Sequence, residues 1–101
     1  MSAIHLIKKN DKGLPDIVPV RPGENLYESG FWHVTKEAAR ALIGGKIYFH
    51  AHRGDPSFHG GEILSMRPVG DRIAFRFIHR DDCIGIKTPL KGWLEEMKFV
   101  Y

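Results

Sequence analysis

The sequence of 101 residues contains one cysteine, Cys83, and no long hydrophobic run. A single cysteine cannot form a disulfide within the chain or supply a multi-cysteine zinc site, so the fold must depend on side-chain packing. No apolar run approaches the roughly 18 residues that a membrane span needs, and the first residues lack a signal peptide's apolar stretch and cleavage site. We therefore expect a cytoplasmic protein in which Cys83 is a small buried apolar residue.

Other patterns are also missing. The chain has no internal repeat, no low-complexity tract and no linker between two composition types, so we expect a single domain over residues 1–101. A phosphate-cradling P-loop, a dinucleotide fingerprint and a Ser-His-Asp order are absent as well. Enzyme classes that depend on these motifs are excluded, and the sequence indicates no cofactor.

The residues that are present are those of a water-soluble globule, with 43% hydrophobic and 27% charged residues. The formal net charge is +3, and the basic surplus lies in residues 46–80. That segment also contains four of the six histidines, and its basic residues are mostly arginines, whose planar guanidinium suits phosphate. The arginines are Arg53, Arg67, Arg72, Arg76 and Arg80. This distribution favours a polyanionic partner.

The first half of the chain predicts two short strands and one helix. Residues 3–9 form the first expected strand, the proline-rich stretch that follows should be extended and irregular, and residues 31–34 form a second brief strand. Thr35 is a suitable N-cap for a helix over residues 36–43, which the pair Gly44-Gly45 ends. Helical spacing of the apolar residues predicts that one face of this helix lies on a sheet.

The second half predicts antiparallel strands. Residues 46–52 alternate, with Ile47 and Phe49 on one face and Tyr48 and His50 on the other, and residues 62–79 form a hairpin with its turn at Gly70-Asp71. Ile73, Phe75 and Phe77 are its expected apolar face, and Arg72, Ala74, Arg76 and Ile78 the opposite one. Gly60-Gly61 indicates a bulge or a close backbone approach, and the last residues a closing strand. We therefore expect an α+β fold, a small, partly open antiparallel β-barrel with one capping helix.

Histidines make the most distinctive local pattern. His50, His52 and His59 are candidate metal ligands, since His50-Ala51-His52, six positions after Gly44, resembles part of a cupin motif. The same residue types would also serve metal-free RNA cleavage, with His50 or His52 as the base and Arg76 clamping phosphate. The third interpretation is structural: these histidines lie on a solvated barrel wall or bond to neighbouring backbone.

Aromatic and basic residues form a second pattern. Aromatic faces stack on bases while arginines hold phosphates, as in readers of single strands and flipped bases. The alternative is that most of these aromatic side chains belong to the core. The candidate nucleic-acid-binding residues are Trp32, Tyr48, Phe58, Trp93, Arg53, Arg72 and Arg76, with Phe31 as a further aromatic neighbour.

The central third of the chain, GGKIYFHAHRGDPSFHGGEILSMRPV after the helix, resembles PUA-like barrels of the EVE and ASCH type. The resemblance implies a small barrel that binds RNA or modified DNA bases in an aromatic-lined pocket, with Trp32, Tyr48, Phe58 and Gly61 as counterparts of family positions. We therefore expect a nucleic-acid or nucleotide-binding module without catalytic activity. The alternatives are a small histidine-dependent enzyme, metal-bound or metal-free, and a protein-interaction or inhibitor domain of phage or mobile-element origin.

Overall fold

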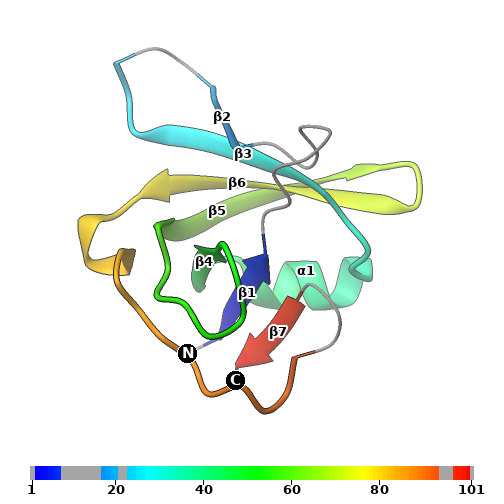
Figure 1. The fold of residues 1–101 in the computed structure, drawn as a ribbon. Coiled ribbons are helices and arrows are strands. Elements are labelled where there is room, and N and C mark those ends of the chain that lie inside the picture. Colours follow the sequence, from blue (N-terminus) through cyan, green and yellow to red (C-terminus); the bar gives the residue numbers. More distant parts are fainter. Residues whose placement is uncertain (1, 8–16, 21–22, 94–96, 101) are drawn as a thin grey trace.

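The computed structural model describes residues 2–7, 17–20, 23–93 and 97–100, without the side chain of Phe31. These residues form seven strands, one α-helix and one 3-10 turn, η2. Figure 1 shows a strongly curled sheet with the helix beside it. The elements are β1 (Ala3–Ile7), β2 (Ile17–Pro19), β3 (Leu26–Trp32), α1 (Lys36–Leu42), β4 (Lys46–His50), β5 (His59–Val69), β6 (Arg72–His79), η2 (Asp81–Cys83) and β7 (Met97–Val100).

The described strands make one mixed sheet in the order β2-β3-β6-β5-β4-β1-β7, with β2 and β7 as its edges. Most neighbours are antiparallel, but β1 is parallel to β4. The expected antiparallel arrangement was therefore wrong at this pair, because the long connection through β2, β3 and α1 returns the chain to run alongside β1. The α+β class is confirmed, whereas the sheet in the described residues is not closed into a barrel.

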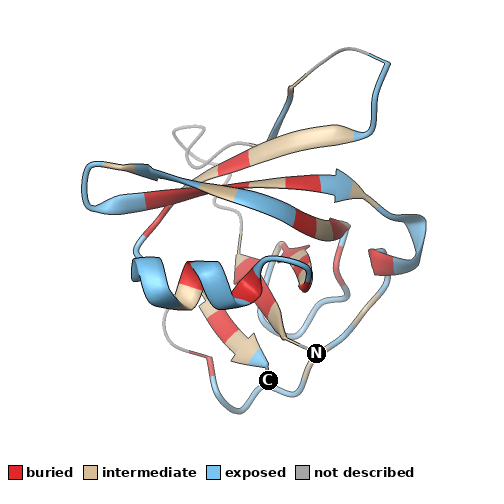
Figure 2. Cartoon of the chain, turned by 180° about the vertical axis from the view of Figure 1, so that it is seen from behind, coloured by how far each residue is buried: buried red, intermediate tan, exposed pale blue. Residues whose placement is uncertain are grey.

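The hydrophobic core lies inside the curl of the sheet. Side chains from both halves contribute to it, for example Ile4 and Leu6 of β1, Phe49 of β4, and Phe75 and Phe77 of β6. Figure 2 shows the exposed residues on the hairpin tip, the loops and one side of α1. Burial of these large apolar side chains is the main force that holds the curled sheet together.

Helix α1 confirms the sequence expectation at both ends. The Thr35 hydroxyl accepts a hydrogen bond from the Ala38 backbone N–H at 3.2 Å. Ala39 and Leu42 are buried against the sheet, and the chain then turns at Gly44, whose φ of +87° lies in the left-handed region that favours glycine.

The β5–β6 hairpin also follows the sequence pattern. Ile73, Phe75 and Phe77 are buried as expected, and Ile78 is exposed. Ala74, predicted on the arginine-bearing face, is buried as well, because Gly30 of the neighbouring strand β3 lies directly against it. A Cβ placed on Gly30 would meet the Ala74 Cβ at 3.0 Å.

The glycine pair at the start of β5 is a place of close backbone approach, as predicted. A Cβ on Gly60 would overlap the carbonyl oxygen of Ile47, and one on Gly61 would overlap the carbonyl oxygen of Ile78. Only glycine allows β5 to lie this close to its two neighbours, β4 and β6.

Candidate functional site

A cluster of polar and aromatic side chains covers the outer face of β1, β4 and β7. His5 lies opposite Tyr48 in the register with β4 and opposite Lys98 in the register with β7. Because side chains alternate along a strand, these residues point away from the core-facing neighbours in each strand. We call the group His5, Tyr48, His50, Trp93 and Lys98 the outer cluster.

The two histidines of the outer cluster are joined by a buried hydrogen bond. His5 Nδ1 and His50 Nε2 are 2.8 Å apart, and His50 Nδ1 is 2.9 Å from the backbone oxygen of Asp55. A carbonyl oxygen can only accept, so His50 Nδ1–H donates to Asp55. In the neutral His50 ring, Nε2 is then the acceptor, and His5 Nδ1–H donates to it. The His5 ring is left with a lone pair on Nε2.

Burial keeps both rings neutral. It lowers the pKa of His5 to about 4, with further contributions from the nearby His50 and the Lys98 ammonium. Burial also lowers the pKa of His50, opposed by its bond to the Asp55 backbone. A general base works best when its pKa is near the working pH, so the His5–His50 pair fits hydrogen bonding better than proton abstraction at neutral pH.

Two aromatic rings enclose these histidines. Tyr48 stacks on His5 with ring centroids 4.6 Å apart and planes 18° from parallel, and Trp93 meets the edges of both histidine rings. Trp93 is 9% exposed, and its indole Nε1 is buried without a hydrogen-bond partner among the described residues. The nearby Lys98 is buried too, and its ammonium donates to the Pro89 oxygen at 2.7 Å.

Hydrogen bonds of Ser57 connect the two loops that adjoin the outer cluster, residues 51–58 and 84–93. Its hydroxyl donates to the Cys83 oxygen at 2.6 Å and accepts from the Ile86 N–H at 3.0 Å. Its backbone makes two more bonds, one to the Ile86 oxygen and one from the Gly85 N–H, both at 2.8 Å. The side chain is 3% exposed, so water cannot readily replace these contacts.

We expect Ser57→Ala to lower the free energy of unfolding by about 2 kcal/mol, because it leaves the Cys83 oxygen and the Ile86 N–H without their partner. Urea unfolding followed by far-ultraviolet circular dichroism would measure the change. The neighbouring Pro56→Ala, at an exposed position, is the control. Equal stability of Ser57→Ala and the parent chain would show that the two loops are not held through this hydroxyl.

A second group, the inner cluster, consists of Tyr27, His59 and His79. His59 and His79 have ring centroids 4.8 Å apart, and Tyr27 meets the His59 ring edge-on at 4.9 Å. His59 also packs against Phe49 and Phe77 of the core, which places this cluster on the inner face of the sheet. Burial, and then the charge of His79, lower the pKa of His59.

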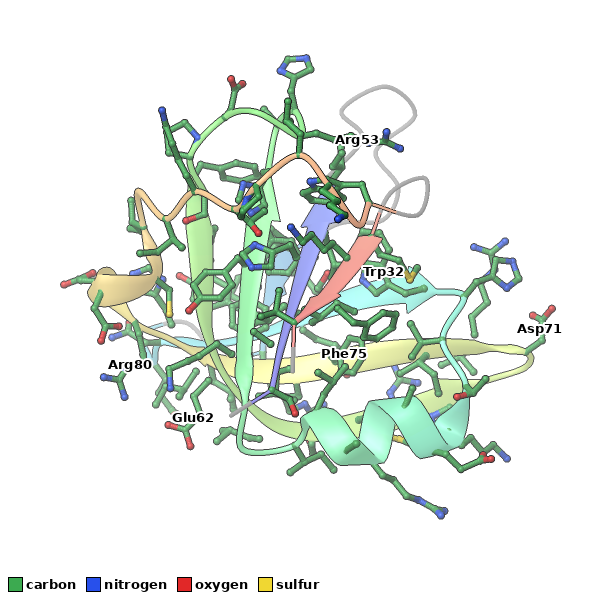
Figure 3. All side chains as sticks on the ribbon, turned by 90° about the horizontal axis from the view of Figure 1, so that it is seen from below. Trp32, Arg53, Glu62, Asp71, Phe75 and Arg80 are labelled. Atoms are coloured by element: carbon green, nitrogen blue, oxygen red, sulfur yellow. The ribbon has the colours of Figure 1, made fainter. Side chains whose placement is uncertain are left out.

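The predicted aromatic site residues do not gather in one place. Tyr48 and Trp93 both contact His5 in the outer cluster, but Trp32 is 2% exposed, belongs to the core and donates its indole N–H to Ser29. Trp32 is therefore not available to stack on a base. Figure 3 shows it pointing into the interior near Phe75. Phe58 is exposed on the loop after β4.

The predicted arginines are likewise spread over the surface, and several face carboxylates of the chain. Arg76 lies 3.5 Å from Glu28, which also binds Arg67 at 2.8 Å. Arg80 binds Asp82 at 2.9 Å. Arg72 is at the far end of β6 beside the hairpin turn, whereas Arg53 is exposed on the loop after β4 (Figure 3). Of the three arginines predicted to bind phosphate, only Arg53 lies on a loop that adjoins the outer cluster.

The three histidines predicted as metal ligands are separated as well. Both ring nitrogens of His50 are engaged, His52 is exposed and bonded to Asp55 at 3.0 Å, and His59 belongs to the inner cluster. Within the described ranges, no group of three or more His, Cys, Asp or Glu side chains is placed to hold a metal ion. The cupin-like spacing therefore does not bring the three together.

Cys83 is buried, as predicted, and burial followed by the charge of Asp82 raises the pKa of its thiol. Sequence reasoning did not find His5, Lys98 or His79 as site residues. Alternation in the first strand does place the His5 side chain on the other face of the strand from Ile4 and Leu6. Which residues surround His5, however, depends on the β1–β4 and β1–β7 pairings.

Comparisons with known proteins add no relative. No protein-family model matches the chain, and no match was found among the curated proteins or the solved structures. The resemblance to PUA-like barrels therefore stays a prediction. In the part of the chain that is described, no helix has the length and apolar character to cross a membrane.

Proposed function

We propose that this chain is a non-catalytic nucleic-acid or nucleotide-binding module that receives one unpaired or flipped base at the outer cluster. The observation that supports this best is the buried Trp93 Nε1–H, which has no partner among the described residues. A buried donor without a partner costs roughly 1–3 kcal/mol, and a ligand that accepts from it removes that cost.

The hydrogen-bonding pattern of the outer cluster suggests which ligand edge fits. Trp93 offers a donor, and His5 Nε2 offers a lone pair, as derived from the His5–His50–Asp55 chain of bonds. A planar ring with a carbonyl beside an N–H complements one donor and one acceptor. Uracil, thymine, guanine and hypoxanthine all have such an edge, and the half-buried Tyr48 ring provides aromatic surface next to it.

Charge and fold are consistent with this ligand. The Lys98 ammonium lies in the cluster and Arg53 lies on an adjoining loop, so both can attract the phosphate of a bound nucleotide. We further propose that the curled sheet is a partly open barrel of the PUA-like type, which the helix beside the sheet and the sheet edges at β2 and β7 in the described residues support. A cytoplasmic location is part of the same proposal and agrees with a single reduced thiol at Cys83.

The test compares two tryptophan variants. Trp93→Phe keeps an aromatic ring but removes the N–H, so we expect about tenfold weaker binding of the preferred oligonucleotide, as loss of one buried hydrogen bond predicts. Trp32→Phe removes an indole N–H that already binds Ser29, and it should leave affinity unchanged. Fluorescence anisotropy with labelled single-stranded RNA and DNA of varied base, at low and high salt, would measure both.

The competing outcomes are distinct. Binding that depends on base and weakens steeply with salt supports the module. No measurable binding to any of the oligonucleotides, or equal loss in the Trp93 and Trp32 variants, contradicts it. In that case a protein partner becomes the leading alternative.

A further inference from the structure

We propose that the inner cluster is a binding site for one late first-row transition-metal ion, Zn²⁺ or Cu⁺, held by Nδ1 of His59 and Nδ1 of His79. This site is separate from the outer cluster, and the proposal does not depend on nucleic-acid binding. It also differs from the His50, His52 and His59 set that the sequence indicates, since His79 replaces two of those residues.

Two unsatisfied atoms are the starting point. The Nδ1 atoms of His59 and His79 are both buried, and neither has a hydrogen-bond partner among the described residues. Their rings are adjacent, with centroids 4.8 Å apart and planes 71° from parallel. Two orphan nitrogens on adjacent rings are rare in folded proteins, and one ion bound by both rings would satisfy them.

A carboxylate determines which tautomer the neutral His79 ring adopts. His79 Nε2 lies 2.9 Å from Asp81 Oδ1, and an ionised carboxylate only accepts, so Nε2 carries the hydrogen. In the neutral ring the lone pair is then on Nδ1, the orphan atom. A carboxylate that binds the distal N–H of a histidine is the usual outer partner of a metal-ligating imidazole.

The surroundings suit a metal bound through nitrogen. Imidazole is a preferred ligand of zinc and copper, and two imidazoles leave further coordination positions for water or a small ligand. Tyr27, Phe49 and Phe77 form apolar walls around His59, while the His79 side chain is 18% exposed and gives solvent access. The neighbouring Arg80 is paired with Asp82 and Glu62, and its charge is therefore partly offset.

The experiment titrates the full chain with Zn²⁺ by calorimetry, and with Cu⁺ under anaerobic conditions against a chromogenic chelator. We expect one ion per chain, with stoichiometric binding lost in both His59→Gln and His79→Gln. Asp81→Asn removes the carboxylate charge from an exposed position and should weaken binding roughly tenfold or more. Circular dichroism of each variant would confirm that it is folded.

The control is His52→Ala, which removes an exposed histidine outside the inner cluster and should bind as tightly as the parent chain. If neither ion binds the parent chain at one per molecule, or if His79→Gln binds unchanged while still folded, the site does not exist. Loss in His52→Ala equal to that in His79→Gln would show nonspecific binding to surface histidines and would also overturn the proposal. Should both glutamine variants fail to fold, Asp81→Asn decides alone: unchanged affinity contradicts the site.

Discussion

Lowering the pH from about 7.5 to about 4 should reduce the free energy of unfolding by about 3 kcal/mol through His5 alone. The pKa of His5 is lowered to about 4 in the folded chain from an ordinary 6.5, chiefly because the ring is buried. Each unit of difference corresponds to about 1.4 kcal/mol. Between these two values the unfolded chain binds the proton and the folded chain does not, so stability is full above about 6.5 and falls as the pH drops toward 4.

Two groups near His5 also lower its pKa. Lys98 faces it from β7 and His50 from β4, and both oppose a positive charge on its ring. Tyr48 and Trp93 contribute aromatic surface and no compensating carboxylate. Protonation of His5 would also place a positive charge in the series of hydrogen bonds that runs from His5 through His50 to the Asp55 carbonyl. The pKa values of His50 and His59 are lowered as well, so the total acid destabilisation should exceed the contribution of His5.

Urea unfolding at several pH values across this range measures the effect. His5→Gln should be less stable than the parent chain at neutral pH but should show a shallower decline on acidification. His52→Ala, at an exposed histidine, should follow the parent profile. A decline in His5→Gln as steep as that of the parent chain would mean that His5 is not the group responsible.

Gly61→Ala is expected to destabilise the fold by about 3 kcal/mol or more. The added Cβ would overlap the carbonyl oxygen of Ile78 and crowd the Phe77 ring. The oxygen belongs to the backbone of β6, so relief requires β5 and β6 to separate, which weakens the hairpin that contributes Phe75 and Phe77 to the core.

Gly54→Ala is the matched control, since a Cβ there meets only the end of the Leu90 side chain at 3.7 Å. Its effect on stability should be within about 0.5 kcal/mol. Thermal and urea unfolding of both variants would compare them. A Gly61→Ala variant as stable as Gly54→Ala would show that the β5–β6 approach is looser than the structure indicates.

Local features of this fold were predictable because neighbouring residues determine them. Thr35 and Gly44 set the limits of the helix through capping and a left-handed turn, and alternation set the buried face of β6. The parallel β1–β4 pair was not predictable in this way, because the residues in and around 3–7 do not indicate which distant strand pairs with them. The barrel prediction assumed antiparallel neighbours and was wrong on that pairing.

The candidate site was predicted only in fragments for the same reason. Tyr48 and His50 were recognised on one face of their strand, but their partners His5 and Lys98 come from strands near the two ends of the described chain. Trp32 was predicted to bind a base because aromatic faces stack on bases, yet the neighbouring strands enclose it in the core. Composition does not distinguish an aromatic residue in a binding site from one in the core, whereas the pairing of the strands does.

The position of β1 between β4 and β7 has a consequence for folding during synthesis. β1 is made first among the described strands, but one of its partners is residues 46–50 and the other is residues 97–100. At typical translation rates of roughly 5–20 residues per second, on the order of ten seconds pass between the appearance of β1 and that of β7. Through that interval the edge of β1 that faces β7 is unpaired, and Lys98 has not yet joined His5. Chaperones that recognise extended, apolar segments therefore have their longest opportunity at residues 3–7.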